Sequence, residues 1–425
     1  MFPRYQHPRD ALEGDLIGDL TCALTDGTGI PPQFVREQIK TALGAILGEV
    51  DYPKQPKMHM RQYTIYLAPP QTSKAEAFKR TCFSIRGYVY SLLKNARVEV
   101  TFLTGSTWGS GVKMIKMLCA SPRQYAFYDE GRVLIETDEA TPNCKITDNL
   151  LTAFDEHTLS SNTVKGDRAH DNAHAESVQL SWGACFTDEY WATDVPGSGL
   201  HRSGLLSRCV FSYQSALPIL AEWQETDNEQ VAEIGRQIAK RLPIPDPFAK
   251  DDDPFAKEDH GMFAGGHNIL QLEIEDDARK LYADFIAVLN QEANRPLAER
   301  LQDYVRKDAV LRTVFGYADN LTITADAMRR AIVWGTDQLE QRRAWWPAID
   351  TYDAVHRQQE SIRGALKKQD KLSLRALKDA CHAFRAKGGL MAFNRALKEL
   401  TTAKAIEVAG QTRKKQPIYA LSTEE

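Results

Sequence analysis

The sequence predicts an α/β fold, with a parallel sheet in the middle of the chain, helical regions on either side of it and a small separate domain at the end. Between residues 61 and 242, short runs rich in β-branched and aromatic residues alternate with helical stretches, which is typical of α/β proteins. Before and after this region, apolar residues recur at helical spacing. From Tyr352 onward both the pattern and the charge change.

The composition places the chain among ordinary globular proteins. With 425 residues, of which 43% are hydrophobic and 26% charged, it has room for about two to three domains and is not disordered, collagenous or coiled-coil. The seven cysteines are scattered and never in CxxC spacing, as expected of reduced thiols in the cytoplasm. No signal-peptide pattern or apolar run of about 20 residues occurs, so we expect a cytoplasmic protein with no membrane partner.

The first 60 residues form the predicted N-terminal helical region (1–60). Pro31 and Pro32 precede a set of apolar residues at helical spacing, and proline is favoured in the first turn of a helix. The members of this set are Phe34, Val35, Ile39, Leu43, Ile46 and Leu47. They predict one helix after Pro31 and a second one before it.

Residues 61–242 form the predicted α/β core. The β-rich runs are 63–67, 98–103, 125–128 and 178–182, and residues 113–118 read as one of the intervening helices. Such alternation predicts strands joined by helical crossovers.

A linker over residues 243–262 is predicted to end the core. It contains four prolines and a tandem repeat, Asp246–Lys250 followed by Asp253–Lys257. Beyond it, residues 263–351 form a predicted helical lid domain, in which Thr324 is the expected cap of the late helix. Trp345 and Trp346 end that helix and are expected to pack in the core or between domains, with base stacking as the alternative.

Residues 352–425 predict a winged-helix domain. Helices are expected near 353–368, from Ser373, and around Leu390, Phe393, Leu397 and Leu400 on one helical face. Two β-like runs follow, at 405–408 and 418–421, separated by a basic turn. Three helices and a β-hairpin in this order are typical of the winged-helix fold.

The charge of the chain is concentrated in this last domain. Residues 352–425 hold 15 Lys and Arg against 8 Asp and Glu, a net charge of +7, whereas residues 1–351 hold 38 against 49, a net charge of −11. Basic residues that neutralise phosphates give salt-dependent affinity for DNA or RNA. We expect Arg395 and Lys398 on the third helix, and Arg413, Lys414 and Lys415 in the turn, to contact nucleic acid. The alternative is a protein–protein module.

A candidate phosphate loop follows the first predicted strand. In the pattern GxxxxGK[ST], glycines admit the phosphates, lysine binds them and a hydroxyl holds Mg²⁺. Here Ala68 and Ser73 replace the two glycines, Lys74 is retained and Ala75 replaces the hydroxyl residue. An ordinary strand-to-helix loop is the alternative interpretation.

Two acidic pairs compete for the place of a metal ligand and a water-orienting carboxylate. Asp129 and Glu130 directly follow the run 125–128, an arrangement suited to nucleotide hydrolysis. Asp138 and Glu139 follow the apolar run 133–135 and have the same two residue types. The residues alone leave both pairs open.

An ordered set of short motifs carries a family resemblance over about residues 10–350. The motifs are Ile30-Pro31-Pro32 with its helix, the loop ending in Lys74, Gly109-Ser110-Gly111 at a helix start, Asp129-Glu130, Leu150–Asp155, Gly204–Arg208 and Ile323–Asp326. This set resembles the YfjI-like prophage P-loop proteins of phages, plasmids and integrated elements. The resemblance implies a P-loop NTPase core of the RecA/AAA type and a helicase-like or initiator role in DNA replication.

The resemblance also implies site residues and cofactors. It favours Asp129-Glu130 as the acidic pair, with Asp129 on Mg²⁺ and Glu130 on the attacking water, and it implies ATP held by Ser73 and Lys74. Arg208 matches an arginine that completes a nucleotide site, from a neighbouring subunit of a homo-oligomer if need be. Because the phosphate loop departs from the pattern, the alternative is a degenerate scaffold that binds DNA and assembles a larger nucleoprotein or defence complex without hydrolysing ATP.

Overall fold

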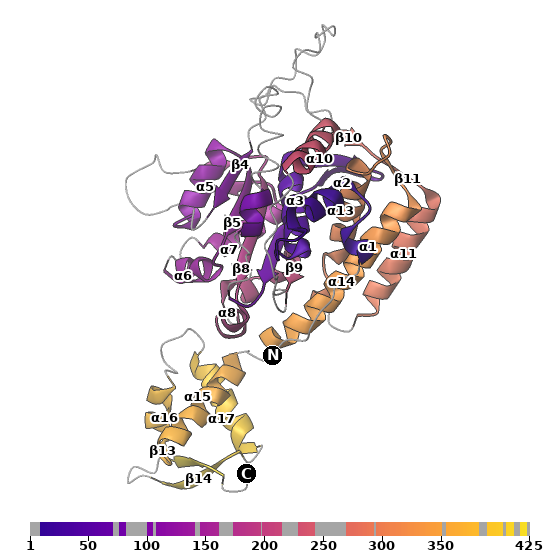
Figure 1. The fold of residues 1–425 in the computed structure, drawn as a ribbon. Helices are drawn as coiled ribbons and strands as arrows, with labels where there is room; N and C mark the ends of the chain where they lie inside the picture. The colour runs from indigo at the N-terminus through magenta and orange to yellow at the C-terminus, as the bar shows by residue number, and fades with distance from the viewer. Residues whose placement is uncertain are drawn as a thin grey trace. The chain divides into compact units, whose positions relative to one another are not determined.

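The computed structural model describes most of the chain and divides it into two compact units. The described ranges are 9–70, 76–81, 100–104, 108–140, 145–160, 173–196, 198–214, 228–242, 269–292, 295–350, 354–381, 389–402, 405–411 and 417–422. The first unit is Met1–Trp345 and the second is Trp346–Glu425 (Figure 1). None of the described helices is long and apolar enough to cross a membrane. The predicted linker 243–262 lies outside the described residues.

A five-stranded parallel sheet forms the middle of the first unit. Its strands are β3 (Tyr63–Leu67), β4 (Thr101–Thr104), β5 (Arg123–Tyr128), β8 (Gln179–Phe186) and β9 (Val210–Tyr213). Their spatial order is β4-β5-β8-β3-β9, and every pairing is parallel. The four predicted β-rich runs are thus confirmed as strands where they fall on described residues. Strands β3 and β8 are buried along their whole length, as parallel strands covered on both faces must be.

The first strand of this sheet, β3, lies between β8 and β9. The chain therefore moves outward from β3 to β4, returns through β5 to β8, and then crosses β3 to reach β9. A reversal of this kind is a topological switch point, where open α/β sheets place their ligands beyond the carboxyl ends of the strands.

Helices connect these strands as the alternation predicts. They are the segment 76–81, α5 (Gly111–Ala120), α6 (Arg132–Ala140), α7 (Ile146–Asp155), α8 (Asp188–Thr193), α9 (Gly199–Arg202) and the 3₁₀ turn η1 (Leu206–Arg208). Helix α10 (Asn228–Arg241) follows the last strand, β9. The Ser110 hydroxyl caps α5 by accepting a hydrogen bond from the Lys113 backbone N–H at 3.2 Å. The helix expected around 113–118 is thereby confirmed.

The N-terminal region contains α1 (Arg9–Leu12), α2 (Leu16–Thr25) and α3 (Pro32–Leu47). The helix start after Pro31 is confirmed, since Pro32 is the first residue of α3. Helix α3 packs on β3, β5, β8 and β9, and all of residues 33–47 are buried. Figure 1 shows α3 between the sheet and the later helices α13 (Leu301–Val314) and α14 (Ala325–Asp350).

The remaining elements of the first unit are two later helices and short strands. The helices are α11 (Asp276–Asn290) and α12 (Arg295–Ala298), and the strands are β1 (Glu49–Tyr52), β2 (Gln55–His59), β6 (Leu159–Ser160), β7 (His174–Ala175), β10 (Leu270–Gln271), β11 (Glu273–Ile274) and β12 (Thr322–Ile323). The mainly helical character expected of 270–350 is confirmed. Thr324 caps α14, because its hydroxyl accepts from the Ala327 N–H at 3.2 Å. Trp345 is buried against Tyr213, with ring centroids 4.3 Å apart, which confirms the packing interpretation for Trp345.

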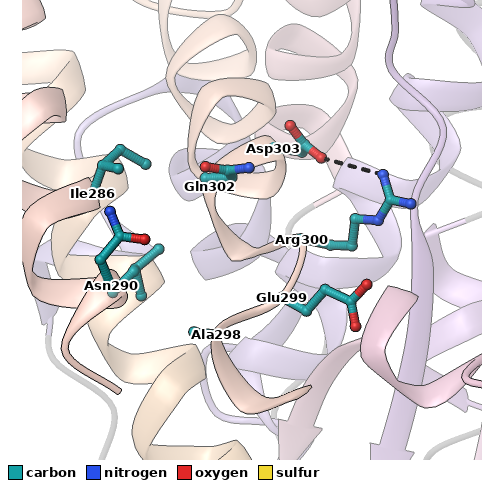
Figure 2. Close-up of a pocket in the computed structure, with 8 residues that line it drawn as sticks. Ile286, Asn290, Ala298, Glu299, Arg300, Gln302 and Asp303 are labelled. Atoms are coloured by element: carbon teal, nitrogen blue, oxygen red, sulfur yellow. Dashed lines mark ion pairs between the residues drawn. The ribbon is translucent and has the colours of Figure 1, made fainter. Parts of the chain in front are cut away.

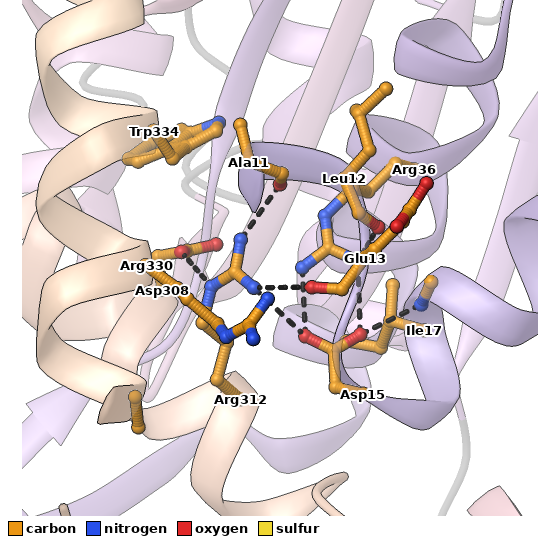
Figure 3. Close-up of polar contacts among 12 residues, drawn as sticks. Ala11, Leu12, Glu13, Asp15, Ile17, Arg36, Asp308, Arg312, Arg330 and Trp334 are labelled. Carbon is orange, nitrogen blue, oxygen red and sulfur yellow. Dashed lines mark hydrogen bonds and ion pairs between the residues drawn. The ribbon is translucent and has the colours of Figure 1, made fainter. Parts of the chain in front are cut away.

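A buried ionic network joins α3 to the N-terminal segment and to α13 (Figure 3). Arg36 pairs with Asp15 at 2.8 Å, and Arg312 reaches the same carboxylate at 3.4 Å. Asp308 in turn pairs with Arg312 at 2.7 Å and with Lys40 at 2.8 Å. All five side chains are at most 2% exposed, so each charge depends on its partners for compensation.

The network continues from Lys40 to α14. Glu37 accepts hydrogen bonds from Lys40 at 3.0 Å and from the Trp334 indole N–H at 2.7 Å. The Lys40 ammonium also lies 3.6 Å from the centroid of the Trp334 ring, a cation–π contact in a buried setting. The polar face of α3 is therefore directed into protein on the side opposite the sheet.

The second unit contains three helices and a three-stranded antiparallel sheet. Its elements are α15 (Ala354–Lys368), β13 (Leu372–Ser373), α16 (Leu374–Ala380), α17 (Gly389–Thr402), β14 (Ile406–Gln411) and β15 (Pro417–Leu421), with strand order β13-β15-β14. The three predicted helices, the Ser373 helix start and both β-like runs are confirmed. Phe393, Leu397 and Leu400 lie in the core of this unit, whereas Leu390, in the first turn of α17, is 37% exposed.

Candidate functional site

The carboxyl edge of the central sheet brings together loops that are far apart in the sequence. Main-chain hydrogen bonds run from Ala68 N to Phe186 O at 3.3 Å, from Gly131 N to Cys185 O at 2.7 Å and from Gln214 N to Leu67 O at 2.9 Å. The starts of the loops after β3, β5, β8 and β9 are thus held side by side. They lie at the switch point of the sheet, where α/β folds bind ligands.

Asp129 and Glu130 lie on this edge. They directly follow β5, both are exposed, and neither has a partner among the described residues. Strand β8 alone separates β5 from β3, so the two strand ends are about 10 Å apart at ordinary sheet spacing. Among the described residues nothing pairs with the two carboxylates, so they can bind a cation or a water beside the loop that follows β3.

Asp138, from the competing acidic pair, has a different role. It lies in α6 rather than after a strand, because the apolar run before it is helical. Its side chain is 3% exposed and accepts hydrogen bonds from the Ile146 N–H at 2.6 Å, the Thr147 N–H at 3.2 Å and the Thr147 hydroxyl. Burial raises the pKa of Asp138 against the effect of these hydrogen bonds. Asp138 therefore caps the N-terminus of α7, and only its exposed neighbour Glu139 faces solvent.

The predicted phosphate-binding residues Ser73 and Lys74 lie outside the described residues. The elements on both sides are described: β3 ends at Leu67, and residues 76–81 are helical. Phe78 anchors this helix to the sheet by stacking on Phe127, with ring centroids 4.2 Å apart and an interplanar angle of 6°. The strand and the helix that a phosphate loop requires are both present.

One residue of this edge has no sequence signal that would reveal it. Gln33 is the second residue of α3, and its side-chain amide donates to the Tyr213 carbonyl at 3.1 Å and to the Gln214 side chain. It ties the start of α3 to the loop after β9. Only the double proline before it hints that a helix begins there, and nothing in the sequence shows which strand end it meets.

Arg208 lies at the opposite, amino edge of the sheet, just before β9 begins. Its guanidinium pairs with Asp155 at 2.7 Å and donates to the Gly204 carbonyl at 3.1 Å. The four residues of β9 alone separate the two edges by about 13 Å. Arg208 is therefore not brought together with Asp129 and Glu130 of its own chain.

Arg342 fixes the surroundings of Arg208. It is fully buried and donates to four carbonyls, those of Ser207 and Cys209 before β9 and those of Leu297 and Glu299 in and just after α12. Burial lowers its pKa to about 10. These bonds hold the turn η1 against α12.

A pocket of about 500 Å³ opens next to this cluster, between α11, α12 and α13 (Figure 2). Arg300 lines it and pairs with Asp155 at 3.4 Å and with Asp303 at 3.9 Å. The other lining residues are Ile286, Leu289, Asn290, Ala298, Glu299 and Gln302. None of the residues predicted from the sequence lines this pocket.

Two histidines and a lysine form a second cluster at the amino edge. The rings of His59 and His157 face each other with centroids 3.4 Å apart, and the Lys307 ammonium donates to the Arg61 carbonyl at 2.7 Å. Burial, reinforced by Arg61, lowers the pKa of His59 to about 3, of His157 to about 4 and of Lys307 to about 7. The cluster keeps its histidines neutral and packs β2 against the segment after α7.

Of the residues predicted to contact nucleic acid, Lys398 is described with its side chain and is exposed on α17. The backbone of Arg395 belongs to α17, but its side chain lies outside the description, as do Arg413, Lys414 and Lys415. Lys398 alone of this set can be placed on a surface.

The described residues contain no group of three or more His, Cys, Asp or Glu side chains that could hold a metal ion. A metal at Asp129 would therefore need ligands from bound phosphate or water, as Mg²⁺ commonly does. No protein-family model matches the chain, and no curated protein sequence matches it. The functional inference therefore depends on the sequence motifs and on the geometry of the described residues.

Proposed function

We propose that this chain is a nucleic-acid-binding, P-loop ATPase-like protein that acts in the DNA replication of a phage or mobile element, as a helicase-like or initiator subunit. The observation that carries the proposal is the exposed pair Asp129 and Glu130 on the carboxyl edge, two strands from the loop that follows β3. Their carboxylates have no partner in the described part of the chain. A strand, a loop with a lysine and a helix at a switch point form a phosphate-binding arrangement.

Each site residue has a separate role in this proposal. Lys74 binds phosphate, with Ser73 beside it in the loop, Asp129 holds the Mg²⁺ ion and Glu130 orients a water. When bound, Mg²⁺-ATP supplies the phosphoryl group and the charge compensation for its transfer. Arg208 contributes from a neighbouring subunit of a homo-oligomer, because it lies at the amino edge of its own sheet.

A degenerate scaffold is the second candidate, and the loop sequence itself favours it. Ala75 stands where a hydroxyl would hold Mg²⁺, and the Ser73 side chain occupies a position that glycine usually leaves open for phosphate. In that case the same core retains assembly and DNA binding, within a nucleoprotein or defence complex, and hydrolyses nothing.

The second unit supplies the nucleic-acid contact in both candidates. Its order of three helices and strands, with β14 and β15 as a terminal hairpin, supports a winged-helix domain. Its net positive charge supports binding to DNA or RNA phosphates. We assign Lys398 and Arg395 to the groove-facing helix, and Arg413, Lys414 and Lys415 to the wing.

The deciding experiment compares DNA-stimulated ATP hydrolysis by the full chain with that of Glu130→Gln. If Glu130 orients water, the substitution lowers turnover by about 100-fold or more. Glu139→Gln is the matched control, because Glu139 is an equally exposed glutamate in the nearby α6, and it should leave turnover unchanged. Wild-type turnover that is absent, or that survives Glu130→Gln, rejects the ATPase and leaves the scaffold.

A further inference from the structure

Five basic residues of the second unit lie close together where α15 ends and α16 begins. Lys367 and Lys368 end α15, Lys371 lies in the turn, and Arg375 and Lys378 occupy successive turns on one side of α16. We call this set the α15–α16 basic surface. The neighbouring apolar residues Leu366, Leu372 and Leu377 are at most 8% exposed and belong to the core, so the basic side chains point the other way.

The basic residues of this surface form no ion pairs with the described carboxylates. Lys367, Lys368, Lys371 and Arg375 are exposed, Lys378 is partly exposed, and none of the five pairs with a carboxylate in the part of the chain that the structure describes. The nearby acidic residues Asp370 and Asp379 are likewise unpaired with them.

Several exposed basic residues of the first unit are ion-paired. Arg236 pairs with Glu233 at 2.9 Å, Lys280 with Asp277 at 3.0 Å and Arg329 with Asp326 at 3.2 Å. Arg279 likewise reaches Asp276 at 3.7 Å. Exposed lysines without an ion pair among the described residues also occur in the first unit, for example Lys54, Lys79 and Lys240. The α15–α16 basic surface differs because five basic residues without such a pair fall within positions 367–378.

Stability of the fold does not account for the arrangement. Lys367 and Lys368 suit the negative end of the α15 dipole, but Arg375 lies in the first turn of α16, where a cation is unfavourable. That turn contains no acidic residue. Like charges crowded at such positions cost stability and are typical of a site kept for a partner.

We propose that the α15–α16 basic surface binds the phosphate backbone of double-stranded DNA without reading its sequence. The proposal rests on the nucleic-acid binding proposed above and names a contact face beyond α17 and the wing. Lysine and arginine side chains at successive positions match a row of phosphates, each neutralised by one cation. In this arrangement the α15–α16 basic surface holds the domain on the DNA backbone, and Lys398 on α17 adds a contact in the groove.

A membrane surface fits these residues less well than DNA does. Helices that bind membranes combine basic residues with exposed large apolar side chains. In the described part of the second unit, the exposed large apolar residues are Leu390 and Val408, on α17 and β14. Neither belongs to α15 or α16, so charge alone must hold the partner.

The test measures binding of the full chain to a fluorescent 20-base-pair duplex by anisotropy, between 50 and 300 mM NaCl. The variant is Lys367→Gln, Lys368→Gln, Lys371→Gln and Arg375→Gln combined. Losing four phosphate contacts should lower the slope of log affinity against log salt by about 3 and the affinity at 100 mM NaCl by at least about 30-fold. The matched control replaces Arg236, Arg279, Lys280 and Arg329 by Gln, removes the same charge, and should stay within about twofold of wild type.

Each alternative outcome has a distinct meaning. If the variant has an unchanged melting temperature and an unchanged salt slope, the α15–α16 basic surface is not the DNA contact. The proposed function then still stands, provided that the wild type binds the duplex. An equal loss in the control overturns this surface as the contact too, since net charge would then explain binding. A wild type that does not bind the duplex at 50 mM NaCl rejects both proposals, and binding to phosphatidylserine vesicles instead identifies a membrane as the partner.

Discussion

The first and second units use charged residues in opposite ways. In the first, Asp15, Arg36 and Asp308 are buried in a closed network, and several exposed basic residues are ion-paired. In the second, the α15–α16 basic surface faces solvent and forms no ion pair with any described residue. The comparison teaches that charge holds the fold of the first unit together, whereas in the second unit it is available to a partner.

The largest effect on stability is expected from a substitution in the buried ionic network of the first unit. Asp308→Asn removes the charge that compensates Lys40 and Arg312 at 2.8 and 2.7 Å. Two buried cations are then left short of a partner, and we expect a loss of about 3–5 kcal/mol in the free energy of unfolding. Urea unfolding followed by circular dichroism measures it.

Asp277→Asn is the matched control for this prediction. Asp277 pairs with Lys280 at 3.0 Å on the exposed surface of α11, where such pairs contribute at most about 1 kcal/mol. If Asp308→Asn does not fold, replacing Asp308, Lys40, Arg312 and Glu37 by Leu, Met, Met and Gln removes the linked charges together and should restore folding. A loss no larger than that of Asp277→Asn would show that the buried network does not stabilise the first unit.

We expect acid to destabilise the first unit through two partly buried histidines. His59 and His157 have pKa values lowered to about 3 and about 4, so the folded chain keeps them neutral. The unfolded chain takes up protons near pH 6.5, so the free energy of unfolding should fall as the pH drops from about 6.5 towards 4. The slope of unfolding free energy against pH measures this effect.

The double variant His59→Gln with His157→Asn should flatten that slope. Asparagine is chosen because residue 157 has φ of 60°, which asparagine tolerates. His174→Gln is the control, since His174 is exposed on β7 and lies outside the stacked pair. If His174→Gln flattens the slope equally, the pH dependence does not come from His59 and His157.

The smallest expected effect lies in the second unit. Lys371→Gln removes an unpaired, exposed charge and should change the free energy of unfolding by no more than about 0.5 kcal/mol. Calorimetry of the full chain measures this change, with Asp308→Asn measured in parallel for comparison. A loss above about 1 kcal/mol would mean that Lys371 stabilises the fold and is not reserved for a partner.

Local patterns in the sequence were enough to predict most elements. Pro32 begins α3 and Ser373 caps α16 because both signals act within a few residues. The apolar run 133–135 shows the limit, since three apolar residues fit a strand or a helix equally well. It is part of α6, and this is why Asp138 is a capping residue and not a rival to Asp129.

The placement of the site residues depended on topology, which the sequence does not contain. Asp129 can be assigned to a strand end from its neighbours, but the edge on which Arg208 lies follows from the position of β9 beside β3. The burial of Arg36 and Lys40 could not be predicted from the sequence either. Their polarity suggests solvent. The carboxylate that pairs with Lys40 is Asp308, on a helix more than 250 residues later in the chain, and Asp15, which pairs with Arg36, is shared with Arg312 of that same helix.

The enclosure of α3 has a consequence for how the protein is made. A ribosome releases residues 32–47 long before α13, so Lys40 of α3 has no Asp308 to pair with until the first unit is almost complete. Contacts this distant slow folding and expose intermediates to aggregation. A nascent chain halted before Leu301 should therefore remain bound to chaperones, whereas one extended past Trp345 should be released with α3 enclosed.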